Sequence, residues 1–160
     1  MSYPSSATSD VLVAGGHGAG INNTQLNSPL GVYFDLLTNS LIIVNHAGHN
    51  VVRWKLGDDH WTLLAGDAQG TGGTSATSLS GPTFITLDPM GNLYVADRSN
   101  YRIQMFANGE LAGKTVAGIT RKSGSNSTLL HTPWSVALDN QLNLYVADAF
   151  NHRIQKFLRY

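Results

Sequence analysis

Residues 144–157 read LYVADAFNHRIQKF: an apolar stretch, a short polar turn and a second apolar stretch. Such a pattern predicts a β-hairpin. The chain repeats it at residues 93–106 (LYVADRSNYRIQMF) and, more loosely, at residues 41–54 (LIIVNHAGHNVVRW). The turn begins with Asn or Asp in each copy, at spacings of 52 and 51 residues. A fixed period of this size is the signature of a repeat architecture, and it takes precedence over any local interpretation.

The sequence around each hairpin repeats as well. A short apolar segment ends in Ala-Gly before the first hairpin and again after the first and second hairpins, and a polar connection of Gly, Ser, Thr and Asn follows it. Each connection closes with a leucine three residues before a proline, and we expect this leucine to fill a gap between neighbouring units: Leu26, Leu79 and Leu130. A further strand after each proline gives four short strands per repeat. No window has a helical period, so essentially no helix is predicted.

Composition limits the class of protein. Charged residues are 12% of the 160 residues, and there is no cysteine, which excludes disulfides and thiolate metal sites. The net charge is zero, which argues against a dedicated nucleic-acid binder, but residues 1–97 carry −5 and residues 98–160 carry +5. No apolar stretch approaches the roughly 20 residues of a membrane span. Residues 1–9 lack the basic start and apolar core of a secretory signal, so we expect a flexible leader and favour a cytoplasmic location.

Four strands in about 51 residues is the unit of a β-propeller blade. The sequence here resembles the NHL repeat. NHRI at residues 151–154 matches its turn closely, NYRI at 100–103 nearly so, and GHNV at 48–51 departs from it. The resemblance implies an all-β propeller of four-stranded antiparallel blades. We expect a strand at 10–15, blade 1 at 29–66, blade 2 at 82–118, and blade 3 at 133–160 without its own fourth strand.

Three blades are fewer than the roughly four to eight of a closed ring. We therefore expect a homodimer that completes a six-bladed ring, in which Val11–Gly15 of one copy closes the last blade of the other. A fragment of a longer propeller, excised or engineered, and a compact three-bladed monomer remain alternatives.

Each hairpin carries a pair of polar residues five positions apart. The pair is Asp and Arg in the second and third copies and changes jointly to two asparagines in the first. A joint exchange within one chain indicates contact, so we predict that the pairs brace the turns through hydrogen bonds and have no catalytic role: Asn45 with Asn50, Asp97 with Arg102, and Asp148 with Arg153. Asn100 and Asn151 are expected to hold the turn backbone, either in a left-handed conformation or through a side-chain bond, and Gly48 takes this place in the first copy.

In a four-stranded meander the hairpin turns and the long connections lie at the same end, so they share one face of a ring. We predict a binding surface on this loop face, formed by histidines, cations and aromatic residues: His46, His49, Arg98, Tyr101, Arg121, Lys122, His131, Trp134, Phe150 and His152. Aromatic and Arg side chains are the usual anchors of protein interfaces, and they also bind single-stranded RNA. Packing of Trp134 and Phe150 between blades is the alternative for those two residues.

The predicted function is a non-catalytic scaffold that binds a protein or peptide. RNA binding by the same face is the alternative, as the family resemblance implies, and a propeller lyase is a further one. His46 and His49 have a spacing that could share a metal ion, but no cysteine or nearby carboxylate completes a set, so they are expected to be exposed turn residues. We predict no metal, no cofactor and no membrane partner.

Overall fold

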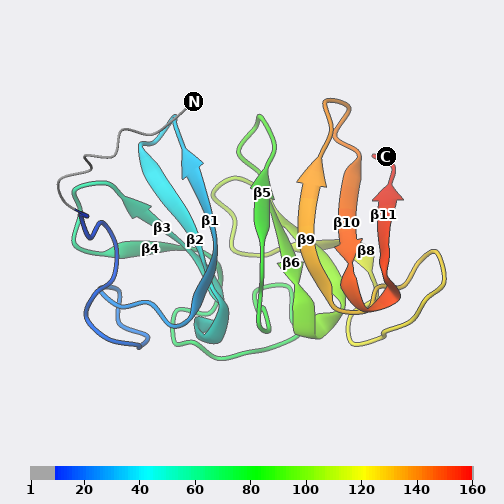
Figure 1. Cartoon of the computed structure of the whole chain (residues 1–160), viewed down its shortest axis with the longest axis horizontal. Coiled ribbons are helices and arrows are strands. Elements are labelled where there is room, and N and C mark those ends of the chain that lie inside the picture. The colour runs from blue at the N-terminus through cyan, green and yellow to red at the C-terminus, as the bar shows by residue number, and fades with distance from the viewer. Residues whose placement is uncertain (1–9, 160) are drawn as a thin grey trace.

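Eleven strands form three antiparallel sheets within residues 10–159, the part of the chain that the computed structural model describes (Figure 1). Blade 1 consists of β1 (Pro29–Asp35), β2 (Ser40–Asn45), β3 (Asn50–Lys55) and β4 (Trp61–Gly66). Blade 2 consists of β5 (Ile85–Leu87), β6 (Leu93–Asp97), β7 (Arg102–Phe106) and β8 (Lys114–Gly118). Blade 3 has β9 (Pro133–Leu138), β10 (Leu144–Asp148) and β11 (Arg153–Phe157). The all-β architecture of successive four-stranded units is thus confirmed.

The core lies between the blades. Ile42, Val44 and Val51 of blade 1 pack against Leu93 and Val95 of blade 2 in one cluster of buried residues. A second cluster repeats this arrangement between blades 2 and 3. Because the middle strands are covered on both faces, they are nearly continuous apolar runs and not alternating ones.

Two of the three predicted leucines fill these junctions. Leu79 is fully buried between blades 1 and 2, and Leu130 is fully buried between blades 2 and 3. Leu26 packs on the outer face of blade 1, against the cluster that contains Val52 and Trp54. The junctions are tight near the inner strands, since a Cβ on Gly31 would lie 3.0 Å from the carbonyl oxygen of Thr83.

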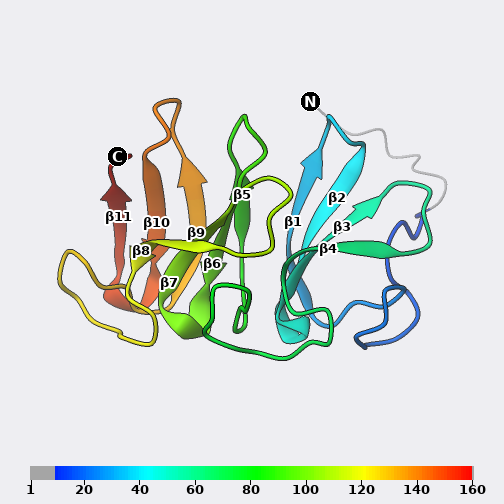
Figure 2. The same cartoon turned by 180° about the vertical axis from the view of Figure 1, so that it is seen from behind.

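Each hairpin turn is a single 3₁₀ turn: His46–Gly48 between β2 and β3, Arg98–Asn100 between β6 and β7, and Ala149–Asn151 between β10 and β11. These turns and the connections before each blade lie at the lower edge of the molecule in Figure 2. The prediction of no helix therefore needs one correction, for these short turns. None of them has the length or apolar character of a membrane-spanning helix, and no other helix occurs in residues 10–159.

Two predicted strands differ from the structure. Residues 10–15 form no strand in the single chain, where β11 lies at the opposite end of the three blades; Ala14 packs instead against the apolar face of blade 1. The first strand of blade 2 is short, Ile85–Leu87, although Phe84 still accepts a hydrogen bond from the backbone of Ala96. The predicted leader at residues 1–9 and the predicted last residue of blade 3 lie outside the described residues.

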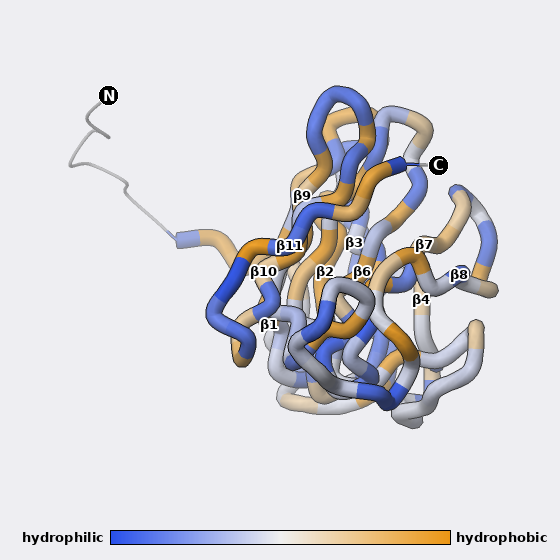
Figure 3. Tube along the Cα trace, turned by 90° about the vertical axis from the view of Figure 1, so that its right-hand side faces the viewer, coloured by the Kyte–Doolittle hydropathy of each residue, from blue (hydrophilic) through white to orange (hydrophobic). Residues whose placement is uncertain are grey.

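The outer faces of blades 1 and 3 carry exposed apolar residues. Ile154 on β11 is 69% exposed, whereas the equivalent Val51 and Ile103 are fully buried by the next blade. On β1, Val32 is 61% exposed, whereas its equivalent Ile85 is 2% exposed. Figure 3 looks onto the β11 side of the molecule. Each of these two faces is one half of a junction of the type seen between the blades.

Candidate binding face at the loop end of the blades

The predicted brace is present in blade 2. The Arg102 Nε donates to Asp97 Oδ2 at 2.8 Å, and both side chains are buried. Asn100 Nδ2 donates to the same oxygen at 2.8 Å, and the Ser80 backbone N–H donates to Asp97 Oδ1 at 2.7 Å. Burial raises the pKa of the Asp97 carboxyl, and the hydrogen bonds from Ser80, Asn100 and Arg102 act against that rise. Blade 3 repeats the pair, with Arg153 Nε 2.8 Å from Asp148 Oδ2.

The brace also holds the connection before its blade, which the sequence did not indicate. The Nη atoms of Arg102 donate to the carbonyls of Thr74, Ser75 and Ser78 at 2.9 to 3.0 Å. Those of Arg153 donate in the same way to Ser125, Asn126 and Leu129. Each arginine therefore ties the long connection before its blade, residues 67–84 for Arg102 and residues 119–132 for Arg153, to the hairpin of that blade.

Blade 1 has a neutral brace. Asn45 Nδ2 donates to Asn50 Oδ1 at 3.1 Å, and Asn45 Oδ1 accepts from the Asn27 backbone N–H at 2.5 Å. Asn50 Nδ2 donates to the carbonyl of Asp67, in the connection after its blade and not in the one before it. A Cβ on Gly48 would collide with the Asn45 side chain, so glycine at this position makes room for the neutral pair.

The turn asparagines act through their side chains. Asn100 Nδ2 reaches the carbonyl of Gly73 at 2.8 Å, and Asn151 Nδ2 reaches that of Gly124 at 2.7 Å. The left-handed residue is the next one in each turn, Tyr101 (φ 57°) and His152 (φ 51°). Of the two predicted roles, only the side-chain bond is present.

The prediction that His46 and His49 are exposed is wrong, because both are half-buried against the next connection. His46 Nδ1 is 2.9 Å from the carbonyl oxygen of Pro82, and His49 Nδ1 is 2.9 Å from the backbone N–H of Gly81. Since a carbonyl only accepts and an N–H only donates, Nδ1 carries the proton in His46 and is the acceptor in His49. Within residues 10–159 no group of three His, Asp or Glu side chains is placed to hold a metal ion.

The other predicted residues cluster around the turns of blades 2 and 3. The Arg98 guanidinium lies over the Trp134 ring, 5.4 Å from its centroid, and Trp134 is 48% exposed. His131 meets Tyr101 and Phe150 edge to face, at centroid distances of 5.9 and 5.2 Å. Phe150 is 60% exposed. Trp134 and Phe150 thus keep much of their surface in solvent although each contacts another side chain.

The free charge on this face is positive. The carboxylates of Asp97 and Asp148 are taken by the braces, whereas Arg98, Arg121 and Lys122 form no ion pair within the described residues. Arg121 and Lys122 are exposed. They lie close to the turn of blade 2, since the Arg121 N–H donates to the Asn100 carbonyl. His152 is also exposed. The structure therefore brings aromatic and basic side chains together on one half of the loop face.

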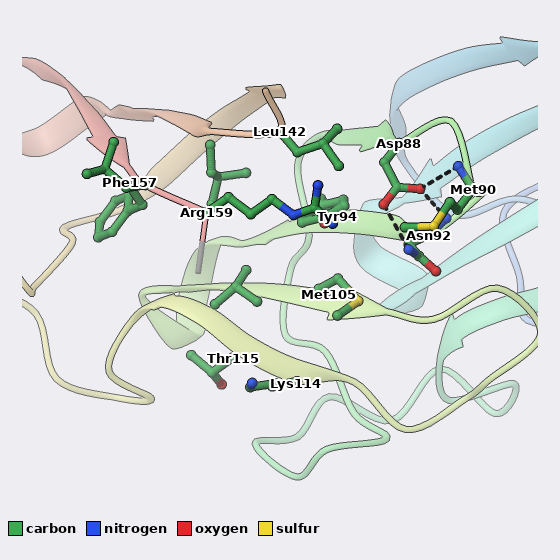
Figure 4. Close-up of a pocket in the computed structure, with 13 residues that line it drawn as sticks. Asp88, Met90, Asn92, Tyr94, Met105, Lys114, Thr115, Leu142, Phe157 and Arg159 are labelled. Carbon is green, nitrogen blue, oxygen red and sulfur yellow. Dashed lines mark hydrogen bonds between the residues drawn. The ribbon is translucent and has the colours of Figure 1, made fainter. Parts of the chain in front are cut away.

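A groove lined by both polar and apolar residues lies between blades 2 and 3 on the opposite side of the molecule (Figure 4). Its volume is about 420 Å³, and Met90, Tyr94, Met105 and Phe157 line it, with the Asp88 turn at one end. The equivalent cavity between blades 1 and 2 is about 70 Å³, because the connection that contains Leu111 covers it. Sequence reasoning did not identify this groove, whose walls come from both blades.

The blades match a known repeat. The family model of the NHL repeat matches residues 79–106 and 130–157. NHL repeat-containing protein 3 of Mus musculus is 34% identical over 92 residues, and the protein of the same name from Homo sapiens is 33% identical over 92 residues. These matches cover 58% of this chain and 26% of each relative.

Solved structures share the fold at low identity. A protein of unknown function from Bacteroides thetaiotaomicron superposes with a TM-score of 0.68 at 18% identity, over 81% of this chain and 34% of that one. An auxiliary nutrient binding protein from Bacteroides ovatus gives 0.63 at 19% identity, over 78% and 36%. A streptogramin B lyase gives 0.62 at 8% identity, over 88% and 41%. The fold is that of a β-propeller, and residues 79–106 and 130–157, in blades 2 and 3, match the NHL repeat.

Proposed function

We propose that the chain is a non-catalytic propeller module that binds a protein or peptide through its loop face. The observation that carries this proposal is the exposed Trp134 ring beneath the Arg98 guanidinium, together with the exposed ring of Phe150 in the hairpin turn of the same blade. Rigid aromatic and arginine side chains supply most of the energy of protein interfaces. The braces support such a role, because they fix the loops that present these side chains.

Peptide selection from a random display library tests the proposal. Peptides enriched by the wild-type chain should bind Trp134→Ala at least about tenfold more weakly. Leu37→Ala is the matched control, since Leu37 is 93% exposed in the β1–β2 turn, away from the loop face. Enrichment that is lost equally in both variants, or no enrichment at all, would contradict the proposal.

RNA binding by the same face is the alternative that the basic residues favour. Arg121 and Lys122 stand next to the turn that carries Tyr101, and aromatic stacking combined with phosphate contacts is how proteins bind single-stranded RNA. A labelled oligouridine whose affinity falls steeply with salt and weakens in Arg121→Ala/Lys122→Ala would favour RNA. A lyase-type activity removed by a chelator would contradict both binding functions.

We also propose that a second copy of the chain covers the outer faces of blades 1 and 3. In support, exposed Ile154 and Val32 occupy positions whose equivalents are buried in the junctions between blades. Two copies related by a two-fold axis would form two such junctions and a six-bladed ring, with Val11–Gly15 free to pair with β11 of the other copy.

Light scattering tests this assembly. The wild-type chain should have twice the mass of the 17.2 kDa protomer, and Ile154→Lys should dissociate it, whereas Leu37→Lys should not. A wild-type species of 17.2 kDa would rule out the dimer.

A further inference from the structure

The guanidinium of each brace arginine donates to three backbone carbonyls of one loop. In blade 2 the Arg102 Nη1 and Nη2 atoms donate to two consecutive carbonyls, Thr74 and Ser75. In blade 3 the Arg153 Nη1 and Nη2 atoms donate to Ser125 and Asn126. In both blades Nη2 donates as well to the carbonyl three residues later. The chain thus builds the same guanidinium site twice, from loops of different sequence.

The connection before blade 1 ends in the same backbone arrangement. The Gly20 N–H donates to the Leu26 carbonyl, just as Gly73 donates to Leu79 and Gly124 donates to Leu130. Counted from these glycines, Ile21 and Asn22 are equivalent to the consecutive pair Thr74 and Ser75. No arginine of the hairpin reaches them, because the short Asn50 stands at the position of Arg102.

A cavity of about 380 Å³ occupies the corresponding place in blade 1. Ile21, Asn22 and Ala68 line it, and Ala68 is equivalent to Thr120, whose hydroxyl accepts from Arg102 Nη1 at 3.1 Å. Blade 1 therefore lacks both the arginine and the hydroxyl group that the arginine contacts in blade 2. The remaining lining residues are Asn23, Trp61 and Gln69.

The lining suits a planar cation. The Trp61 Nε1 donates to the Gln25 carbonyl at 2.8 Å, which takes the place of the third carbonyl contact and fixes the ring beside the cavity. By their equivalence to Thr74 and Ser75, Ile21 and Asn22 supply two adjacent carbonyl acceptors; the Asn22 carbonyl also accepts from the Gln25 N–H, as the Ser75 carbonyl accepts from the Ser78 N–H. No lysine, arginine or histidine lines the cavity. A guanidinium can donate to a pair of acceptors with its edge and stack on an indole with its face, which an ammonium group cannot do.

We propose that this cavity binds the guanidinium of an arginine side chain from outside the chain, between the carbonyls of Ile21 and Asn22 and the ring of Trp61. The proposal goes beyond the function proposed above, because the cavity lies on blade 1 and shares no residue with the surface around Trp134. The bound guanidinium would contact two consecutive carbonyls, as those of Arg102 and Arg153 do within their own blades.

N-acetyl-arginine amide is the probe for this site, and N-acetyl-lysine amide is its matched control. In two-dimensional NMR the indole N–H of Trp61 should shift saturably with the arginine compound, with a dissociation constant of about 1 to 10 mM for so small a ligand. The lysine compound should bind at least about tenfold more weakly. Equal shifts with both compounds, or no saturable shift, would overturn the proposal.

Two variants place the binding in the cavity. Asn45→Asp/Asn50→Arg copies the brace of blade 2, fills the cavity with the chain's own guanidinium and should abolish the shift. Ala68→Leu narrows the cavity without touching the hairpin and should weaken binding at least about tenfold if both variants keep a dispersed, folded spectrum. Binding that persists in both variants would place the ligand elsewhere and contradict the proposal.

Discussion

The hairpins of blades 1 and 2 hold the same turn shape with different chemistry. In blade 2 a buried carboxylate and guanidinium form the brace, and the guanidinium extends to three loop carbonyls. In blade 1 two amides bond to each other, and the loop before the blade makes one bond to the pair, in which the Asn27 N–H donates to Asn45 Oδ1. The difference shows that the turn itself needs only a hydrogen-bonded pair. The charged guanidinium of blade 2 is needed to hold the loop before the blade.

The comparison of the two hairpins also explains why the Asp97 carboxylate is buried. Both of its carboxylate oxygens accept hydrogen bonds, from the turn, the loop and Arg102. The pair therefore stabilises the surface that the loops form. The following substitutions test the difference between the two hairpins.

Arg102→Asn should have the largest effect. It leaves the Asp97 carboxylate buried without its cation and removes the donors to Thr74, Ser75 and Ser78. Breaking one side of a buried ion pair costs about 3 to 5 kcal/mol, and urea unfolding at pH 7 should show a loss of this size. A loss below about 1 kcal/mol would mean that the pair is not the brace described here.

Asp97→Asn/Arg102→Asn copies the pair of blade 1 and should be less harmful than the single change, with a loss of about 1 to 2 kcal/mol. No charge is left buried, and the amide oxygen that replaces the Asp97 carboxylate can still accept from the Ser80 N–H, as Asn45 accepts from Asn27. The double-mutant cycle measures this coupling. A double variant as unstable as Arg102→Asn would show that the loop contacts, and not the buried charge, dominate the cost.

Arg153→Asn should cost about 1 to 2 kcal/mol, less than Arg102→Asn, because solvent screens the partly exposed Arg153 guanidinium, although Asp148 is buried. The Arg153 side chain is 29% exposed, whereas that of Arg102 is 3% exposed, although the two make equivalent contacts. Urea unfolding of the two variants side by side checks this order. Equal losses would assign the energy to the carbonyl contacts that both arginines share.

The deficit of Arg102→Asn should shrink in acid. Burial already raises the folded-state pKa of Asp97 above 3.8, and loss of Arg102 removes interactions that lower it, so the pKa rises further. A carboxyl with a raised folded-state pKa destabilises the fold when ionised; the deficit is full above that pKa and falls as the pH drops toward 3.8. As the pH falls from 7 toward 3.8, urea unfolding should show the deficit of Arg102→Asn decreasing, against no such decrease in Asp97→Asn/Arg102→Asn.

The repeat, the four-stranded units and the contact between the brace residues were predictable, because each depends on side chains that recur at a fixed period. The roles of Leu79 and Leu130 followed from the same period. The carbonyl contacts of Arg102 were not predictable, since backbone acceptors leave no trace in the sequence. The burial of His46 and His49 escaped prediction for the same reason, as their partners are backbone atoms of Pro82 and Gly81.

The cavity on blade 1 arises because the first repeat has shorter side chains at two positions: Asn50 where blade 2 has Arg102, and Ala68 where blade 2 has Thr120. A sequence comparison of the repeats shows both changes, but only the folded loops show that they meet at one place. The positions of residues 10–15 could not be predicted either, because the repeat assigns this segment a strand that pairs with β11 of another copy and does not say where the segment packs in a single chain.

Native-state amide hydrogen exchange tests most directly whether the brace arginines hold the loops. In the wild-type chain the amides of Gly73 and Ser80 should be better protected than those of Gly20 and Asn27, which make equivalent hydrogen bonds. In Arg102→Asn the protection of Gly73 and Ser80 should fall to the level of blade 1, while Gly124 stays unchanged. Equal protection of the two loops in the wild-type chain, or protection that survives the loss of Arg102, would contradict this account.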